Sequence, residues 1–189
     1  MKIILALSVL LLLAVAIVLI LAARKPDVFG VQRSATIDAP AERIFPLIND
    51  LRAHERWSPF DKPDPATRKT YTGAATGTGS VYAWDGSGQA GSGRIAITGS
   101  SANTRIIMQL DMLKPFKASN VVRFDLEPVD GGTLVTWSMQ GNTPYLAKVV
   151  HVFMDMDREV GGQFETGLAN LKSITEQHEP ALAQAQDLP

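Results

Sequence analysis

The last quarter of the chain carries a regular apolar pattern that limits the possible folds. Apolar side chains recur at steps of three and four through residues 145–177, namely Val149, Phe153, Met156, Val160, Phe164, Leu168, Leu171 and Ile174. At about 100° per residue they form one stripe along a single long helix. Such a helix is stable only when its apolar side covers another apolar surface, and the only large candidate is the sheet expected before it.

One glycine interrupts this stripe. Gly167 lies between Phe164 and Leu168, where alanine would favour the helix by about 1 kcal/mol. One interpretation is a close contact between the helix and a strand, or a kink that divides the segment near Glu159. The other interpretation is space left beneath the helix for a ligand.

The middle of the chain has the pattern of β-strands. Seven segments are predicted as strands, separated mostly by short turns, namely residues 31–37, 68–72, 79–85, 94–99, 103–112, 119–127 and 133–141. Short connections favour antiparallel pairing. Two short helices are expected between the first two strands, one beginning at Asp38-Ala39-Pro40 and one over residues 51–56.

This order predicts an α+β fold in which a curved antiparallel sheet of about seven strands wraps around the long C-terminal helix. One helix cannot cover seven flat strands, so the sheet must curl. A curled sheet with a helix across its mouth encloses space, and large apolar side chains line pockets for small molecules. The predicted ligand-binding residues are Trp57, Tyr82, Trp84, Met108, Leu110, Phe124, Trp137, Met139, Phe164, Gly167 and Leu168. In the alternative interpretation, the aromatic members of this set simply fill a core.

An uncharged apolar run opens the chain. Residues 3–23, from Ile3 to Ala23, contain only one polar side chain, Ser8. As a helix this run is about 31 Å long, close to the ~30 Å hydrocarbon core of a bilayer. It predicts a single-pass transmembrane anchor over residues 1–24, with a cleaved secretory signal as the alternative. Basic residues shortly after the run favour a cytoplasmic position for the domain that follows.

The rest of the chain divides into a short linker (25–30), one domain (31–178) and a tail (179–189) rich in Ala, Gln and Pro that is expected to be flexible. The net charge of −1, without any block of like charges, argues against a nucleic-acid partner. The chain has no cysteine, and its three histidines lie far apart, so no metal site and no cofactor are expected. The sequence does not indicate an oligomeric state.

Three side chains are candidates for acid–base chemistry if the chain is an enzyme, namely His54, Glu55 and Tyr82. His54 and Glu55 precede Trp57 in the second short helix, which could border the entrance of the expected cavity. Tyr82 shares a strand face with Trp84. A solvated helix side and a phenol at the edge of a core are the simpler interpretations, so no catalytic residue is assigned.

Several short segments occur in a fixed order along the chain. They are Ile37-Asp38-Ala39-Pro40-Ala41-Glu42-Arg43-Ile44-Phe45, Asn49-Asp50-Leu51, Trp57-Ser58-Pro59, Asp130-Gly131-Gly132-Thr133, Val135-Thr136-Trp137 and Gly167-Leu168-Ala169-Asn170-Leu171-Lys172. Their order and spacing over residues 31–177 resemble the polyketide cyclase/dehydrase-like branch of the START-related, Bet v 1-like (SRPBCC) superfamily. The resemblance implies a helix-grip fold with a hydrophobic cavity between the sheet and the C-terminal helix. Its members include lipid and hormone carriers and aromatase/cyclases, so it implies no single reaction.

Three functions remain open at this point. The favoured one is a membrane-anchored domain that binds a hydrophobic small molecule or lipid in an internal cavity. The second is a polyketide cyclase/dehydratase-like enzyme, and the third is a regulatory interaction module at the membrane that has no ligand. An apolar lining would favour binding, inward-facing ionisable groups would favour the enzyme, and a filled interior would favour the interaction module.

Overall fold

The computed structural model describes residues 2–61, 66–86 and 91–177. Its helices are α1(Lys2–Ala23), α2(Ala41–Asn49), the 3-10 helix η1(Ala53–Arg56), α3(Tyr145–Phe153) and α4(Met156–Glu176). Its strands are β1(Val28–Ile37), β2(Arg68–Gly73), β3(Ser80–Asp85), β4(Ser92–Ser101), β5(Arg105–Lys114), β6(Ala118–Val129) and β7(Gly132–Asn142). The tail that was predicted to be flexible lies outside the described residues.

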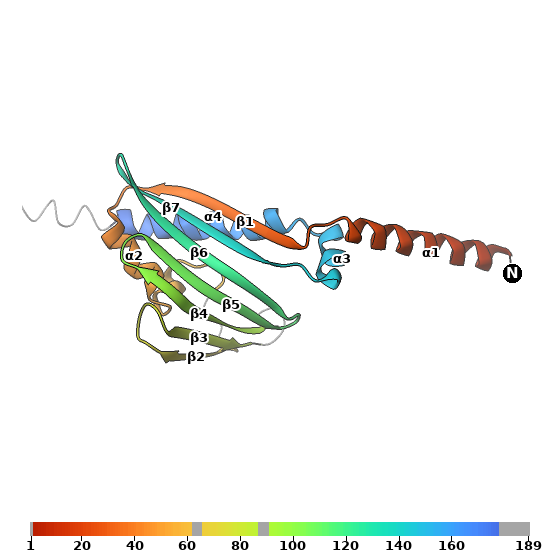
Figure 1. The fold of residues 1–189 in the computed structure, drawn as a ribbon, viewed down its shortest axis with the longest axis horizontal. Coiled ribbons are helices and arrows are strands. Elements are labelled where there is room, and N and C mark those ends of the chain that lie inside the picture. Colours follow the sequence, from red (N-terminus) through yellow and green to blue (C-terminus); the bar gives the residue numbers. More distant parts are fainter. Residues whose placement is uncertain (1, 62–65, 87–90, 178–189) are drawn as a thin grey trace, which may run out of the picture.

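The strands form one antiparallel sheet of seven strands, as predicted. Its order is β1-β7-β6-β5-β4-β3-β2, so the first strand pairs with the last. The pairing of β4 with β5 shifts between Ser92 and Gly93 and again between Ile97 and Gly99, and such irregularities bend a sheet. Figure 1 shows the curved sheet with α4 along one face, which confirms the α+β helix-grip fold.

The two ends of the sheet have different surroundings. Val28 of β1 pairs with Asn142 of β7 at the end where α1 enters, which we call the α1 end (Figure 1). At the opposite end, where Ile37 pairs with Thr133, the sheet is followed by α2 and η1. α4 packs mainly against β1. β1 begins at Val28, within the segment 25–30 that was predicted as a linker. Only residues 24–27 therefore separate α1 from the sheet.

The predicted C-terminal helix is divided into two helices. α3 ends at Phe153, and Met154 after it has an extended backbone with φ −123° and ψ 131°. The side chain of Asp155 then accepts a hydrogen bond of 3.2 Å from the backbone N–H of Arg158 and so caps the start of α4. The prediction of one continuous helix over residues 145–177 is therefore wrong, and the division lies before the kink considered near Glu159.

Candidate functional site

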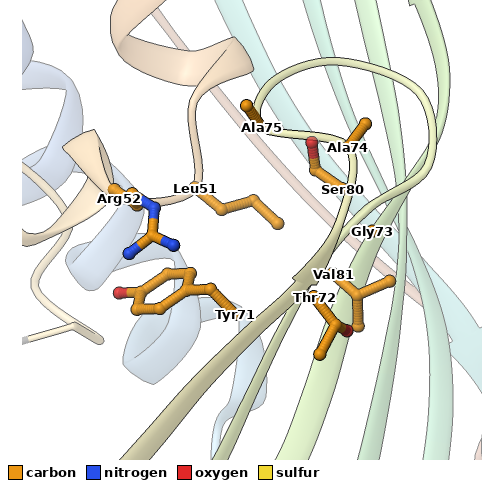
Figure 2. A pocket seen from close by; sticks show the side chains of 9 residues that line it. All are labelled: Leu51, Arg52, Tyr71, Thr72, Gly73, Ala74, Ala75, Ser80 and Val81. Atoms are coloured by element: carbon orange, nitrogen blue, oxygen red, sulfur yellow. The ribbon is translucent and has the colours of Figure 1, made fainter.

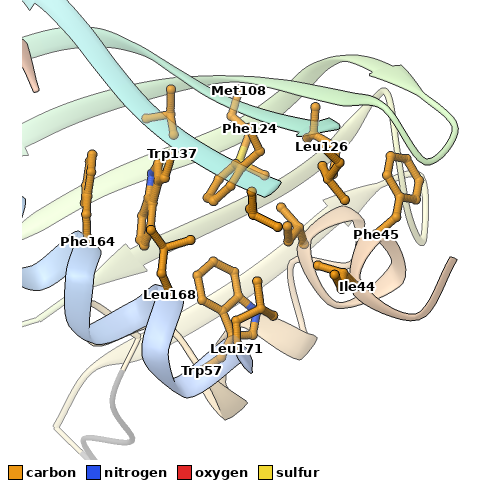
Figure 3. Packing of buried hydrophobic residues seen from close by; sticks show 14 of the residues in the cluster. Ile44, Phe45, Trp57, Met108, Phe124, Leu126, Trp137, Phe164, Leu168 and Leu171 are labelled. Carbon is orange, nitrogen blue, oxygen red and sulfur yellow. The ribbon is translucent and has the colours of Figure 1, made fainter. Parts of the chain in front are cut away.

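Aromatic side chains fill the space beneath α4 (Figure 3). Trp137 of β7 stacks on Phe164 of α4, with 4.1 Å between ring centroids and 8° between ring planes. Trp57 and Phe124 contact the same indole, with centroids 5.5 Å and 4.9 Å away. All four side chains are buried. These four predicted ligand-binding residues therefore form a packed core, the alternative that the sequence left open.

Gly167 allows α4 to approach this core closely. A Cβ added at Gly167 would lie 2.7 Å from Cζ3 of Trp137 and 3.1 Å from Cδ of Pro59. Carbon atoms in contact are normally about 3.5–4.0 Å apart, so any larger residue would push the helix outward. The structure thus favours the close-contact interpretation of Gly167 over space left for a ligand.

The remaining predicted ligand-binding residues differ in exposure. Tyr82, Met108, Met139 and Leu168 are buried, whereas Trp84 and Leu110 are only partly buried. Ile95 and Met112, which the prediction did not include, share this partial exposure and the same sheet face. Ile95 pairs with Leu110, and Gly93 pairs with both Trp84 and Met112. We call Trp84, Ile95, Leu110 and Met112 the open apolar strip.

A buried polar side chain borders this strip. Asn120 pairs with Leu110 on one side and with Gly141 on the other, which places it at the α1 end of the sheet. Its amide oxygen lies over Gly141, only 1.8 Å from where a Cβ would be, and Asn120 is 7% exposed. This oxygen has no hydrogen-bond partner among the described residues. A buried polar atom without a partner costs about 1–3 kcal/mol, so it marks a place where a bound molecule or water could complete the site.

Asn120 could have been found from the sequence. Its position alternates with Val122, Phe124 and Leu126, which the strand pattern already placed on the inner face. Trp137 on the neighbouring strand also keeps a buried indole N–H without a hydrogen-bond partner in the described part of the chain. Ser80, which alternates with Tyr82 on β3, also has a buried hydroxyl without a partner there, so the inner face carries at least three unpaired polar atoms among apolar side chains.

The three acid–base candidates lie in one cluster with Asp61. Nδ1 of His54 is 3.9 Å from a carboxylate oxygen of Asp61, and the charge of the same carboxylate acts on the hydroxyl of Tyr82. Glu55 accepts a 2.6 Å hydrogen bond from Nζ of Lys69. The cluster joins η1 to β2 and β3, and it brings Tyr82 close to His54 and Glu55 although Tyr82 is distant from them in the chain.

The protonation of this cluster favours a structural role. Burial is the main factor that lowers the pKa of His54, whose Nε2 is 2.8 Å from the backbone oxygen of Ile48. The ring is therefore neutral near pH 7 and donates Nε2–H to that oxygen. Burial and then the charge of Asp61 raise the pKa of Tyr82, which stays a neutral phenol. Both rings are almost inaccessible, at 4% exposure each.

Two of the hollows on the surface of the described residues contain no predicted ligand-binding residue. The first has a volume of about 220 Å³ and is shown in Figure 2. It is lined by Leu51, Arg52, Tyr71, Thr72, Gly73, Ala74, Ala75, Ser80 and Val81. The second, of about 540 Å³, lies between the start of α2 and the β6–β7 turn. Within the described ranges, no group of three His, Asp or Glu side chains is arranged to hold a metal ion.

Comparison with known proteins identifies the family. The model of a family described as polyketide cyclase/dehydrase and lipid transport matches residues 29–176, most of the chain. The chain belongs to this family. The match confirms the resemblance noted in the sequence and covers every strand of the sheet except the first residue of β1. Comparison with curated proteins gave no match.

Solved structures share the polyketide cyclase/dehydrase family fold at low identity. Protein CV1439 from Chromobacterium violaceum is 14% identical, with a TM-score of 0.55 over 80% of this chain and 99% of that chain. An uncharacterised protein from Rhizobium leguminosarum is 16% identical, with a TM-score of 0.58 over 79% and 95%. The di-domain aromatase/cyclase StfQ of the steffimycin biosynthetic pathway is 11% identical, with a TM-score of 0.58 over 80% and 51%.

Proposed function

We propose that this family member binds a hydrophobic molecule of lipid type on the open apolar strip, and that α1 holds the domain at a bilayer. One observation carries the proposal: the unpaired amide oxygen of Asn120 borders partly exposed apolar side chains at the α1 end of the inner face. The matching ligand is mainly apolar and carries one hydrogen-bond donor, such as a hydroxyl group.

The location differs from the cavity expected beneath α4. There the stacked rings of Trp137 and Phe164 occupy the space, while Trp84 and Leu110 farther along the face keep accessible surface. Removing apolar surface from water contributes about 25 cal/mol per Å². An acyl chain or isoprenoid lying along the strip would gain most of its binding free energy in this way, and Asn120 would set its orientation.

Membrane attachment rests on α1. This helix has 22 residues, a mean hydropathy of 3.4 in its most apolar window, and none of that window is buried in the protein. A helix of this length reaches about 33 Å, enough for the hydrocarbon core of a bilayer. Retention of α1 in the mature protein is measured by intact mass of the chain purified from host membranes. A mature chain that begins after residue 23 would show instead that the run is a cleaved signal.

The binding proposal can be tested with a fluorescent fatty acid, cis-parinaric acid, and the full chain in detergent or nanodiscs. Leu110→Gln places an amide in the strip and should weaken binding by about 10-fold or more. Ile107→Gln is the matched control, because Ile107 lies on β5 but on the opposite face and is also partly buried. Equal effects of both variants would place the probe elsewhere.

Native mass spectrometry of the chain from host membranes should show a co-purifying lipid-sized adduct that Leu110→Gln reduces. If no adduct and no probe binding are found, the ligand-free interaction module is the better description. The enzyme alternative has less support, because Tyr82 adjoins the strip through Ile95 yet is buried, at 4% exposure.

A further inference from the structure

α3 has its polar and apolar sides reversed relative to a helix on a soluble domain. The one buried residue of α3 is Lys148, at 7% exposure. Its Nζ forms a 2.6 Å ion pair with Asp27 at the start of β1. On the other side, Leu146 is 64% exposed and Phe153 is 72% exposed. Such a helix holds its cation inward and presents its apolar side outward.

The outward side is continuous along the helix. At 100° per residue, Leu146, Val149, Val150 and Phe153 lie within one face, and the two valines between the exposed ends are partly exposed. In water this arrangement leaves the apolar surface unburied. At the boundary of a bilayer the same face would be removed from water.

α3 also lies directly against the apolar N-terminal helix. The hydroxyl of Tyr145 donates a 2.9 Å hydrogen bond to the backbone oxygen of Leu19, and α1 and α3 pack on one another. Leu19 is four residues from the end of α1, which corresponds to about 6 Å along the helix axis. With α1 across a bilayer, α3 is therefore placed at the level where hydrocarbon meets head groups.

A second exposed apolar element occurs at the same end of the molecule. The last residues of β5 and the turn that follows, together called the β5–β6 turn, carry Leu113 at 54% and Phe116 at 63% exposure, with Lys114 and Lys117 beside them. Ala118, just after this turn, is two residues before Asn120, which pairs with Gly141 at the α1 end. Figure 1 shows the β5–β6 turn and α3 both at the α1 end of the sheet.

We infer that α3 and the β5–β6 turn form a contact surface for the bilayer, in which Phe153 and Phe116 enter the interface. Aromatic and aliphatic tips flanked by lysines suit a bilayer that contains anionic lipids. The inference rests on the proposed attachment through α1. It adds that the domain lies against the lipid surface in one orientation, with the open apolar strip at the lipid-facing end.

The chain lacks cysteine, so single labelling sites are available in the full-length protein. Phe153→Cys and Phe116→Cys are labelled with the fluorophore NBD and reconstituted in vesicles of three parts phosphatidylcholine and one part phosphatidylglycerol. Val129→Cys, also partly exposed but at the opposite end of the sheet, is the matched control. Lipids with a doxyl quencher at carbon 5 should quench the labels at 153 and 116 at least about threefold more than the label at 129.

A fourth label, at Leu12→Cys in α1, separates the two proposals. If a deeper doxyl group quenches the label at residue 12 but the labels at residues 153 and 116 are not quenched, the membrane anchor is supported and the contact surface is overturned. Absence of quenching at 12 would overturn the anchor and the contact surface together. A label at 153 that is shielded from water-soluble quencher but not quenched by lipid would show that a second copy of the chain covers α3, which also overturns the inference.

Discussion

Trp137 and Phe164 stack almost parallel, with ring centroids 4.1 Å apart, and so join β7 to α4 at the centre of the domain. Both rings are buried, at 5% and 2% exposure. This contact fills the inner face beneath α4, whereas the open apolar strip toward the α1 end keeps partly exposed apolar surface.

Gly167→Ala should lower the free energy of unfolding by about 1–3 kcal/mol. The added methyl group would overlap the ring of Trp137, and overpacking of this kind outweighs the helix-propensity gain of about 1 kcal/mol. Urea denaturation followed by circular dichroism measures the change. Gly162→Ala is the control: a Cβ there meets nothing within 4 Å, so the variant should be stabilised by about 0.5–1 kcal/mol. Equal stabilisation of both variants would contradict the close contact.

Alanine substitutions at two phenylalanines of the same sequence stripe, Phe164 and Phe153, should have very different effects on stability. Phe164→Ala removes a ring from the core and should cost about 3–5 kcal/mol. Phe153→Ala changes a side chain that is 72% exposed and should alter stability by no more than about 0.5 kcal/mol in detergent. Thermal unfolding of both variants checks the prediction, and a large loss at Phe153 would mean that α3 and α4 form the continuous helix first expected from the sequence.

Stability should fall as the solution is acidified below about pH 6.5, the pKa of histidine in an unfolded chain. Burial lowers the pKa of His54 in the folded protein, so the unfolded chain binds more protons in the window between the two values. The free energy of unfolding should fall by at most about 1.4 kcal/mol per pH unit for one group. This decrease is complete only below the pKa of His54 in the folded protein, and there is no decrease above pH 7.

His54→Gln keeps a possible hydrogen bond to the backbone oxygen of Ile48 but cannot titrate, so its unfolding free energy should vary less between pH 7.5 and 5.5. His151→Gln is the comparison variant. Burial also lowers the pKa of His151, but this ring is less buried than that of His54. His151→Gln should therefore reduce the pH dependence of the unfolding free energy less than His54→Gln does. An unchanged slope in His54→Gln would contradict the assignment of a buried neutral imidazole.

Asn120→Leu should stabilise the protein and weaken ligand binding at the same time. Replacing this amide, whose buried oxygen is unpaired, with an apolar group of similar size removes a desolvation penalty of about 1 kcal/mol. The same change removes the acceptor proposed for the ligand, so affinity for a hydroxylated probe such as farnesol should fall relative to a hydrocarbon probe. Asn142 is exposed and lies one residue after Gly141, the residue of β7 that pairs with Asn120. Asn142→Leu should leave both quantities nearly unchanged.

Most of the fold could be predicted because its signals are local. Alternation placed Val122, Phe124 and Leu126 on one strand face, and all three are buried together. The stripe through Phe164, Leu168 and Leu171 likewise predicted the buried side of α4. The short turns between consecutive strands then predicted antiparallel pairing.

The division between α3 and α4 escaped prediction for a physical reason. The spacing from Phe153 to Met156 continues the apolar period across the break, and periodicity cannot distinguish a face that meets a sheet from one that points away. One signal was present: Asp155 is a preferred N-cap residue, and Asp157 and Glu159 follow in the first turn.

The candidate site depends on relationships that no single segment contains. Gly141 leaves room for the amide of Asn120 from the next strand, and Gly93 does the same for the indole of Trp84. Such pairs depend on strand register, which alternation constrains only to within a shift of two residues. The sequence therefore supplied a set of inward residues but not their division into a sealed core and an accessible strip.

Only four residues, 24–27, connect α1 to β1, and four extended residues span at most about 14 Å. With α1 across a bilayer, as proposed, this short tether keeps the α1 end of the sheet nearest the lipid surface. An apolar molecule leaving the nearer leaflet would then reach the open apolar strip by lateral diffusion, without crossing bulk water.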